Sequence, residues 1–158
     1  METELVSNDW NTLILHFLGL DHIGHKTGSR SVHMHPKQKE MDTLVQRIVV
    51  AQETHRHLSS ALFVLCGDHG MTEGGNHGGS SSSETSTAML LISPKFRSYG
   101  NGTDSPLAFR DDFKYHVETG QSDIIPSLAA MLGFSIPKNS LGILIPEILP
   151  LWPCKSCL

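Results

Sequence analysis

Residues 61–79 read ALFVLCGDHGMTEGGNHGG, and this stretch indicates both the fold class and the place of the chemistry. The first six residues are all apolar, as is typical of a buried strand that ends at Cys66. The loop that follows contains Asp68, His69 and His77 among its glycines. In open α/β sheets, ligands bind beyond the carboxyl ends of the strands, so these side chains lie where a site is expected.

Two further apolar stretches are predicted as strands, residues 11–18 (NTLILHFL) and 87–92 (TAMLLI). Residues 36–58 lie between the first two strands and predict a long amphipathic helix. Its apolar side chains recur at helical spacing: Met41, Leu44, Val45, Ile48 and Val49. Apolar strands that alternate with such a helix predict an α/β domain with a mostly parallel sheet flanked by helices.

A second helix is predicted over residues 123–132, with Ser122 or Asp123 as its N-cap. Gly133 is expected to end it, because glycine readily adopts the left-handed conformation that follows a helix. The irregular excursion before this helix carries an N-glycosylation acceptor at Asn101, in the triplet Asn-Gly-Thr.

Length and charge exclude several functional classes. A chain of 158 residues suffices for one domain, and a net charge of −4 without a basic stripe argues against a nucleic-acid partner. No apolar run reaches the roughly 18–20 residues that span a bilayer, and the acidic start is no signal peptide. We expect a polar lead-in over residues 1–8, a single partial domain over 9–149 and a tail over 150–158.

A second polar motif, residues 19–25 (GLDHIGH), follows the first predicted strand. Asp21 and His25 are four residues apart, so one helical turn would place both on the same side, with Cβ atoms about 5–6 Å apart. They could then share one divalent ion. The plainer interpretation is a helix N-terminus with an acidic first turn. For the later motif, the plainer interpretation is a mobile glycine loop with incidental histidines.

Together the two motifs supply five candidate metal ligands: Asp21, His25, Asp68, His69 and His77. Mixed imidazole and carboxylate donors suit Zn2+, with Mn2+ as the alternative. Five ligands exceed one tetrahedral ion and suggest two ions about 3.5–4 Å apart, an arrangement that catalyses displacement at phosphorus. Three protein ligands would form one site with an open coordination position, whereas two protein ligands are too few for the second ion.

The remaining polar residues have plainer assignments. Glu84 either orients a metal-bound histidine or is a solvated loop residue. We expect His16 to be a core residue within the first strand and His22 to point away from the site. The histidines of the two His-x-His pairs are expected to be exposed: His33, His35, His55 and His57. Cys154 and Cys157 form a single Cys-x-x-Cys pair, which is insufficient for a structural zinc site.

Three motifs carry a resemblance to a known family: LGLDHIGH, CGDHGMTEGGNHGG with SSSET, and QSDIIPSLAAMLGFSIPKNSLG. In order and spacing they resemble the alkaline-phosphatase-like superfamily, and within it the ethanolamine phosphate transferases that build glycosylphosphatidylinositol (GPI) anchors. The resemblance implies a two-zinc enzyme whose fold is incomplete in this chain. Asp21, His25 and His77 match the ligands of one ion, and Asp68 and His69 match two ligands of the other.

The resemblance also implies substrates and a location. Ethanolamine phosphate would pass from phosphatidylethanolamine to a mannose of the GPI glycolipid precursor, at the lumenal face of the endoplasmic reticulum membrane. The transfer would use a threonine nucleophile that neither Thr12 nor Thr27 matches, so we assign no catalytic residue here. That threonine and one more aspartate would lie upstream of this chain, and the family's membrane region would lie downstream.

We therefore expect the isolated chain to bind one divalent ion weakly and to show no turnover, because the nucleophile is missing. We also expect an exposed sheet edge and apolar surface, through which the chain could associate. Two alternatives stay open. One is another metal-dependent phosphodiesterase or sulfatase-like hydrolase of the superfamily, and the other is a non-catalytic metal-binding remnant.

Overall fold

The computed structural model describes residues 2–98 and 117–148, in two compact units, Met1–Pro94 and Lys95–Leu158. The predicted glycosylation site at Asn101 lies outside the described residues, as do the two tail cysteines. Within the described ranges, no helix combines the length and the apolar composition needed to cross a membrane.

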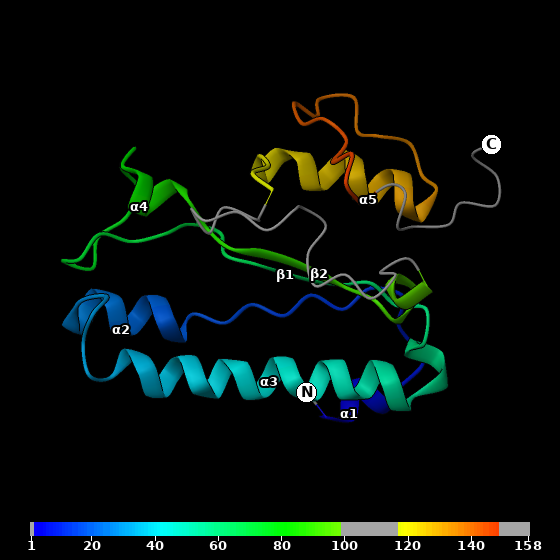
Figure 1. Cartoon of the computed structure of the whole chain (residues 1–158), viewed down its shortest axis with the longest axis horizontal. Coiled ribbons are helices and arrows are strands. Elements are labelled where there is room, and N and C mark those ends of the chain that lie inside the picture. The colour runs from blue at the N-terminus through cyan, green and yellow to red at the C-terminus, as the bar shows by residue number, and fades with distance from the viewer. Residues whose placement is uncertain (1, 99–116, 149–158) are drawn as a thin grey trace. The chain divides into compact units, whose positions relative to one another are not determined.

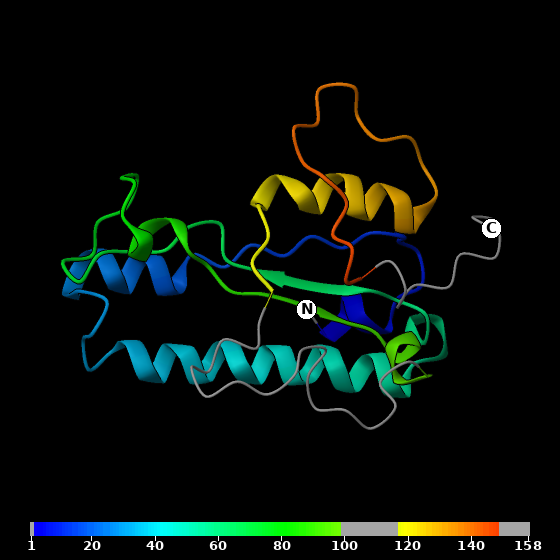
Figure 2. The same ribbon diagram turned by 45° about the horizontal axis from the view of Figure 1, so that its top comes forward.

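Three helices form one side of the first unit (Figures 1 and 2). They are α1 (Glu2–Val6), α2 (Gly19–Thr27) and the long α3 (Met34–Thr54), and both α1 and α2 pack against α3. The predicted helix over residues 36–58 is thus confirmed as α3, followed by one 3-10 turn at Arg56–Leu58. The five apolar side chains that recur at helical spacing along it, from Met41 to Val49, are all half-buried, as predicted.

The sheet differs from the prediction. Strands β1 (Phe63–Cys66) and β2 (Met89–Ile92) are confirmed, but they pair antiparallel, with Phe63 opposite Ile92 and Cys66 opposite Met89. The expected parallel sheet is therefore wrong for the two described strands. Parallel strands need a long crossover connection, usually through a helix. The segment between β1 and β2 instead leaves and returns at one end of the pair, and its helix, α4, is only four residues long (Ser82–Thr85).

Residues 11–18 do not form the predicted strand. The chain runs there as an open trace between α1 and α2 (Figure 1), and Ile14 and Phe17 are 85% and 49% exposed. His16 is exposed as well, so its assignment to the core is wrong. An apolar run becomes a strand only where a neighbour completes its backbone hydrogen bonds, and no described strand pairs with this run. The result is exposed apolar surface, as expected.

The core of the first unit is small and lies between α1, α3 and the 3-10 turn that follows α3. Its buried residues are Leu5, Ala51 and Leu58, and half-buried Trp10 and Ile48 pack around them. The Trp10 indole donates a hydrogen bond to the Glu4 carbonyl at 2.9 Å, which ties this ring to α1.

The second unit contains α5 (Ile124–Leu132), which confirms the predicted helix to within one residue. Gly133 ends it with a left-handed φ of 76°, and its amide donates to the Ala129 carbonyl at 2.9 Å. Asp123 occupies the N-cap position but does not cap α5 with its side chain. Its carboxylate instead accepts hydrogen bonds from the amides of Gly120 and Ile143, both at 2.8 Å.

Candidate metal centre

Helix α2 supplies the first two candidate ligands. Asp21 Oδ1 lies 3.3 Å from His25 Nε2, which confirms that one helical turn brings the two side chains together. The segment after residue 18 is a nine-residue helix, Gly19–Thr27, which supplies this turn. His22 is exposed and is not a member of this cluster.

The third candidate ligand arrives on a tight turn that packs against α2. The amide of Gly75 donates to the Thr72 carbonyl at 3.0 Å, which closes the turn two residues before His77. Gly75 has a positive φ of 83°, and a Cβ built on it would lie 2.0 Å from the carbonyl oxygen of Gly24. Glycine is therefore required at position 75 for this close approach.

The approach places His77 beside both helical ligands. His77 Nε2 lies 3.1 Å from His25 Nε2 and 3.4 Å from Asp21 Oδ1. In a tetrahedral zinc site with bonds of roughly 2.0–2.1 Å, ligand atoms are about 3.3 Å apart. The three atoms thus have the separations of one face of a zinc tetrahedron. In the described ranges, no other group of three histidine, cysteine, aspartate or glutamate side chains brings its ligand atoms this close.

The chemistry of these atoms fits a cation. Asp21 Oδ1 is buried, and no hydrogen bond from the described part of the chain reaches it. A buried carboxylate oxygen without a donor is costly, and two imidazole nitrogens face the same space. A divalent ion between the three atoms would compensate the charge. The His25 side chain remains 43% exposed, so one side of the cluster is open for a further ligand.

Asp68 and His69 form a separate pair at the end of β1. His69 Nδ1 lies 3.0 Å from the Gly70 carbonyl, and its Nε2 lies 3.7 Å from Asp68 Oδ2. A carbonyl oxygen only accepts, so Nδ1 carries a proton, and in the neutral ring the lone pair is then on Nε2. The structure therefore gathers three of the five candidate ligands in one cluster and leaves this pair outside it.

One of the two roles expected for Glu84 was to orient a metal-bound histidine. In the described part of the chain, its carboxylate makes hydrogen bonds with Gly79 and Ser81 instead. Its Oε1 accepts the Gly79 amide at 2.9 Å, and its Oε2 accepts the Ser81 hydroxyl at 2.5 Å. These hydrogen bonds, that of the Ser81 hydroxyl foremost, lower the pKa of Glu84 below its ordinary value. Glu84 therefore acts as an ionised acceptor that joins two parts of the same loop.

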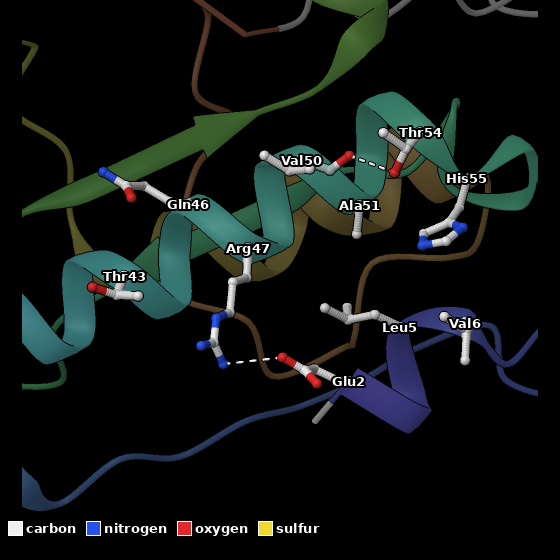
Figure 3. Close-up of a pocket in the computed structure, with 10 residues that line it drawn as sticks. All are labelled: Glu2, Leu5, Val6, Thr43, Gln46, Arg47, Val50, Ala51, Thr54 and His55. Atoms are coloured by element: carbon white, nitrogen blue, oxygen red, sulfur yellow. Dashed lines mark hydrogen bonds and ion pairs between the residues drawn. The ribbon is translucent and has the colours of Figure 1, made fainter.

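A cavity of about 520 Å³ lies elsewhere, between α1 and α3 (Figure 3). The side chains of Glu2 and Arg47 form an ion pair of 3.1 Å on its wall, and Leu5 and Val6 lie on the α1 side. None of the five candidate ligands lines it, so it is not part of the metal cluster. Of the histidines in the two His-x-His pairs, His33, His35 and His57 are exposed as expected, whereas His55 is half-buried. His57 Nε2 lies 3.1 Å from the Leu5 carbonyl.

Comparison with known proteins places these motifs in a family. Residues 1–83 match the family model of type I phosphodiesterases / nucleotide pyrophosphatases. The chain is 55% identical over 149 residues to a GPI ethanolamine phosphate transferase 2 of Aspergillus fumigatus, covering 94% of this chain and 19% of the relative. Proteins of the same name from Candida albicans and Saccharomyces cerevisiae are 52% and 43% identical over 153 residues. They cover 97% and 92% of this chain, and 17% and 18% of the relative.

The chain spans about a fifth of the length of these curated relatives. No solved structure matches it. The resemblance to GPI ethanolamine phosphate transferases is confirmed by the relatives, and the family is consistent with an α/β fold. This chain belongs to the type I phosphodiesterase / nucleotide pyrophosphatase family.

Proposed function

We propose that this chain forms part of the metal centre of an ethanolamine phosphate transferase of GPI-anchor synthesis. The observation that carries the proposal is the cluster of Asp21, His25 and His77, whose ligand atoms lie 3.1–3.4 Å apart. The names of the curated relatives support the same activity, as does their identity of 55% and 52% over nearly the whole of this chain. Phosphatidylethanolamine would be the donor, and a mannose of the GPI precursor would be the acceptor, at the lumenal face of the endoplasmic reticulum membrane.

The cluster would hold one Zn2+, with Mn2+ as the alternative, and Asp68 and His69 would supply two ligands of a second ion. Such ions, when bound, polarise phosphoryl oxygens and lower the pKa of an attacking hydroxyl. Asp21 would offset part of the positive charge. The Gly70 carbonyl would hold the His69 ring in the tautomer that leaves Nε2 available as a ligand.

Metal titration of the purified 158-residue chain tests the first part of the proposal. We expect calorimetry to show one Zn2+ per chain, and Asp21→Asn to abolish most of the affinity. Asp42→Asn, which alters an exposed carboxylate on α3, is the matched control and should bind as the unaltered chain does. Equal binding by both variants would contradict the assignment of Asp21.

A chimeric protein tests the transferase activity. The matching 149-residue segment of the Aspergillus fumigatus relative would be replaced by this chain, and transfer of ethanolamine phosphate to the GPI precursor would be measured. We expect the chimera to be active, and the substitutions Asp21→Ala and Asp68→Ala to abolish transfer. A chimera that hydrolyses phosphodiesters without transferring ethanolamine phosphate would contradict the proposed substrate class.

A further inference from the structure

We propose that Glu84 is a positioning residue of the metal cluster, because it joins the segment that carries His69 to the segment that carries His77. The inference rests on the proposed metal centre and adds a residue that acts through the ligands rather than on the metal. It is based on hydrogen bonds made by both the side chain and the main chain of Glu84.

The carboxylate holds the end of the His77 segment. Gly79, two residues after His77, donates its amide to Glu84 Oε1 at 2.9 Å. A Cβ on Gly79 would lie 2.7 Å from Glu84 Oε2, so the carboxylate would have to shift if any other residue stood there. Gly78 has a positive φ of 98°, and a glycine pair leaves the backbone free to adopt many conformations. The Gly79 hydrogen bond removes part of that freedom immediately after the ligand.

The main chain of the same residue holds the His69 segment. The amide of Gly70, directly after His69, donates to the Glu84 carbonyl at 2.7 Å. The next amide, that of Met71, donates to the Ser83 carbonyl, also at 2.7 Å. Helix α4 (Ser82–Thr85) therefore binds one segment through its carbonyls while the Glu84 carboxylate binds the other.

The capping of α4 fixes the carboxylate in this position. Ser81 and Glu84 form a capping box, in which the Ser81 hydroxyl donates to Glu84 Oε2 and the Ser81 amide lies 3.4 Å from the same oxygen. Both oxygens of Glu84 are thus engaged, one within α4 and one on the His77 segment. Loss of the carboxylate would release Gly79 and let His77 move away from Asp21 and His25.

Three variants separate positioning from charge. Glu84→Ala should weaken Zn2+ binding by about 10–100-fold, as is typical when a residue that supports metal ligands is removed. Glu84→Gln should rescue most of the affinity, because its amide oxygen can accept the Gly79 hydrogen bond and glutamine also completes capping boxes. Glu73→Ala is the matched control, since it removes an equal charge from the same loop, where the exposed Glu73 side chain forms an ion pair with Arg30.

A second measurement uses the metal-free chain. Proton NMR should show contacts between the rings of His69 and His77 and slow amide exchange at Gly79 in the unaltered chain, in Glu84→Gln and in Glu73→Ala. Both signals should be lost in Glu84→Ala, while circular dichroism shows that the helices persist.

The outcomes are distinguishable. If the unaltered chain binds no Zn2+, the proposed metal centre fails, and the NMR measurement still decides the role of Glu84. The positioning role is overturned if Glu84→Ala keeps the ring contacts and the affinity. It is also overturned if Glu73→Ala weakens binding as much as Glu84→Ala does, or if Glu84→Gln is as weak as alanine.

Discussion

The imidazole rings of His69 and His77 stack with centroids 3.7 Å apart and planes inclined by 20°. His69 lies just after β1, whereas His77 lies on the glycine turn that approaches α2, so this contact joins two parts of the loop that follows β1. The His25 ring is a further neighbour of His77, with a centroid separation of 4.9 Å. His77 therefore contacts both groups of candidate ligands, and its position affects the geometry of each.

The helical ligand pair can be tested with neighbouring histidines. His25→Ala should reduce Zn2+ affinity by more than about 100-fold, because it removes a direct ligand and not merely a supporting residue. His22→Ala changes an exposed histidine of the same helix and should leave the affinity unchanged. Calorimetric titration of both variants measures the difference, and a comparable loss in the two would argue against a site at His25.

The close approach of the turn to α2 depends on Gly75. Gly75→Ala should destabilise the first unit by about 1–3 kcal/mol from its positive φ alone, and the clash with the Gly24 carbonyl should add to this. We expect Zn2+ affinity to fall with it, because His77 is displaced. Gly74→Ala is the control, since the nearest atom to its Cβ would be 3.9 Å away. Denaturant unfolding would show whether the two variants differ as expected.

Asp123 should make the second unit sensitive to acid. Hydrogen bonds from the amides of Ile143 and then Gly120 lower the pKa of Asp123 below its ordinary value. The carboxylate therefore adds stability above the unfolded pKa of about 3.9, and this stability is lost as the pH falls through the lower folded pKa. An NMR titration should show the Ile143 amide shifting only in that acidic range. In Asp123→Asn the shift should disappear, and a midpoint above the ordinary carboxyl value would refute the assignment.

Ser127 links α5 to the segment that follows it. Its buried hydroxyl donates to the Asp123 carbonyl at 2.6 Å and accepts the Ile145 amide at 2.9 Å. Ser127→Ala leaves the Ile145 amide without this acceptor and should cost about 1–3 kcal/mol. Ser135→Ala, at an exposed position, should cost little. Amide exchange at Ile145 measures the effect, and unchanged protection in Ser127→Ala would show that the hydroxyl is not needed.

Much of the local structure follows from residue spacing. The apolar period of α3, the stop at Gly133 and the facing pair of Asp21 and His25 each depend on residues within a few positions of one another. The chemical type of the cluster is equally local, because imidazole and carboxylate groups define the metals that they bind. These properties were predictable without any knowledge of how distant segments meet.

Tertiary structure decided the rest. Whether β1 and β2 run parallel or antiparallel depends on the path of the segment between them, and whether residues 11–18 form a strand depends on a hydrogen-bonding neighbour. The position of His77 depends on Gly75, which has no Cβ and so lets its backbone lie against the Gly24 carbonyl of α2. Such contacts arise from long-range packing and hydrogen bonding, which short-range spacing does not encode.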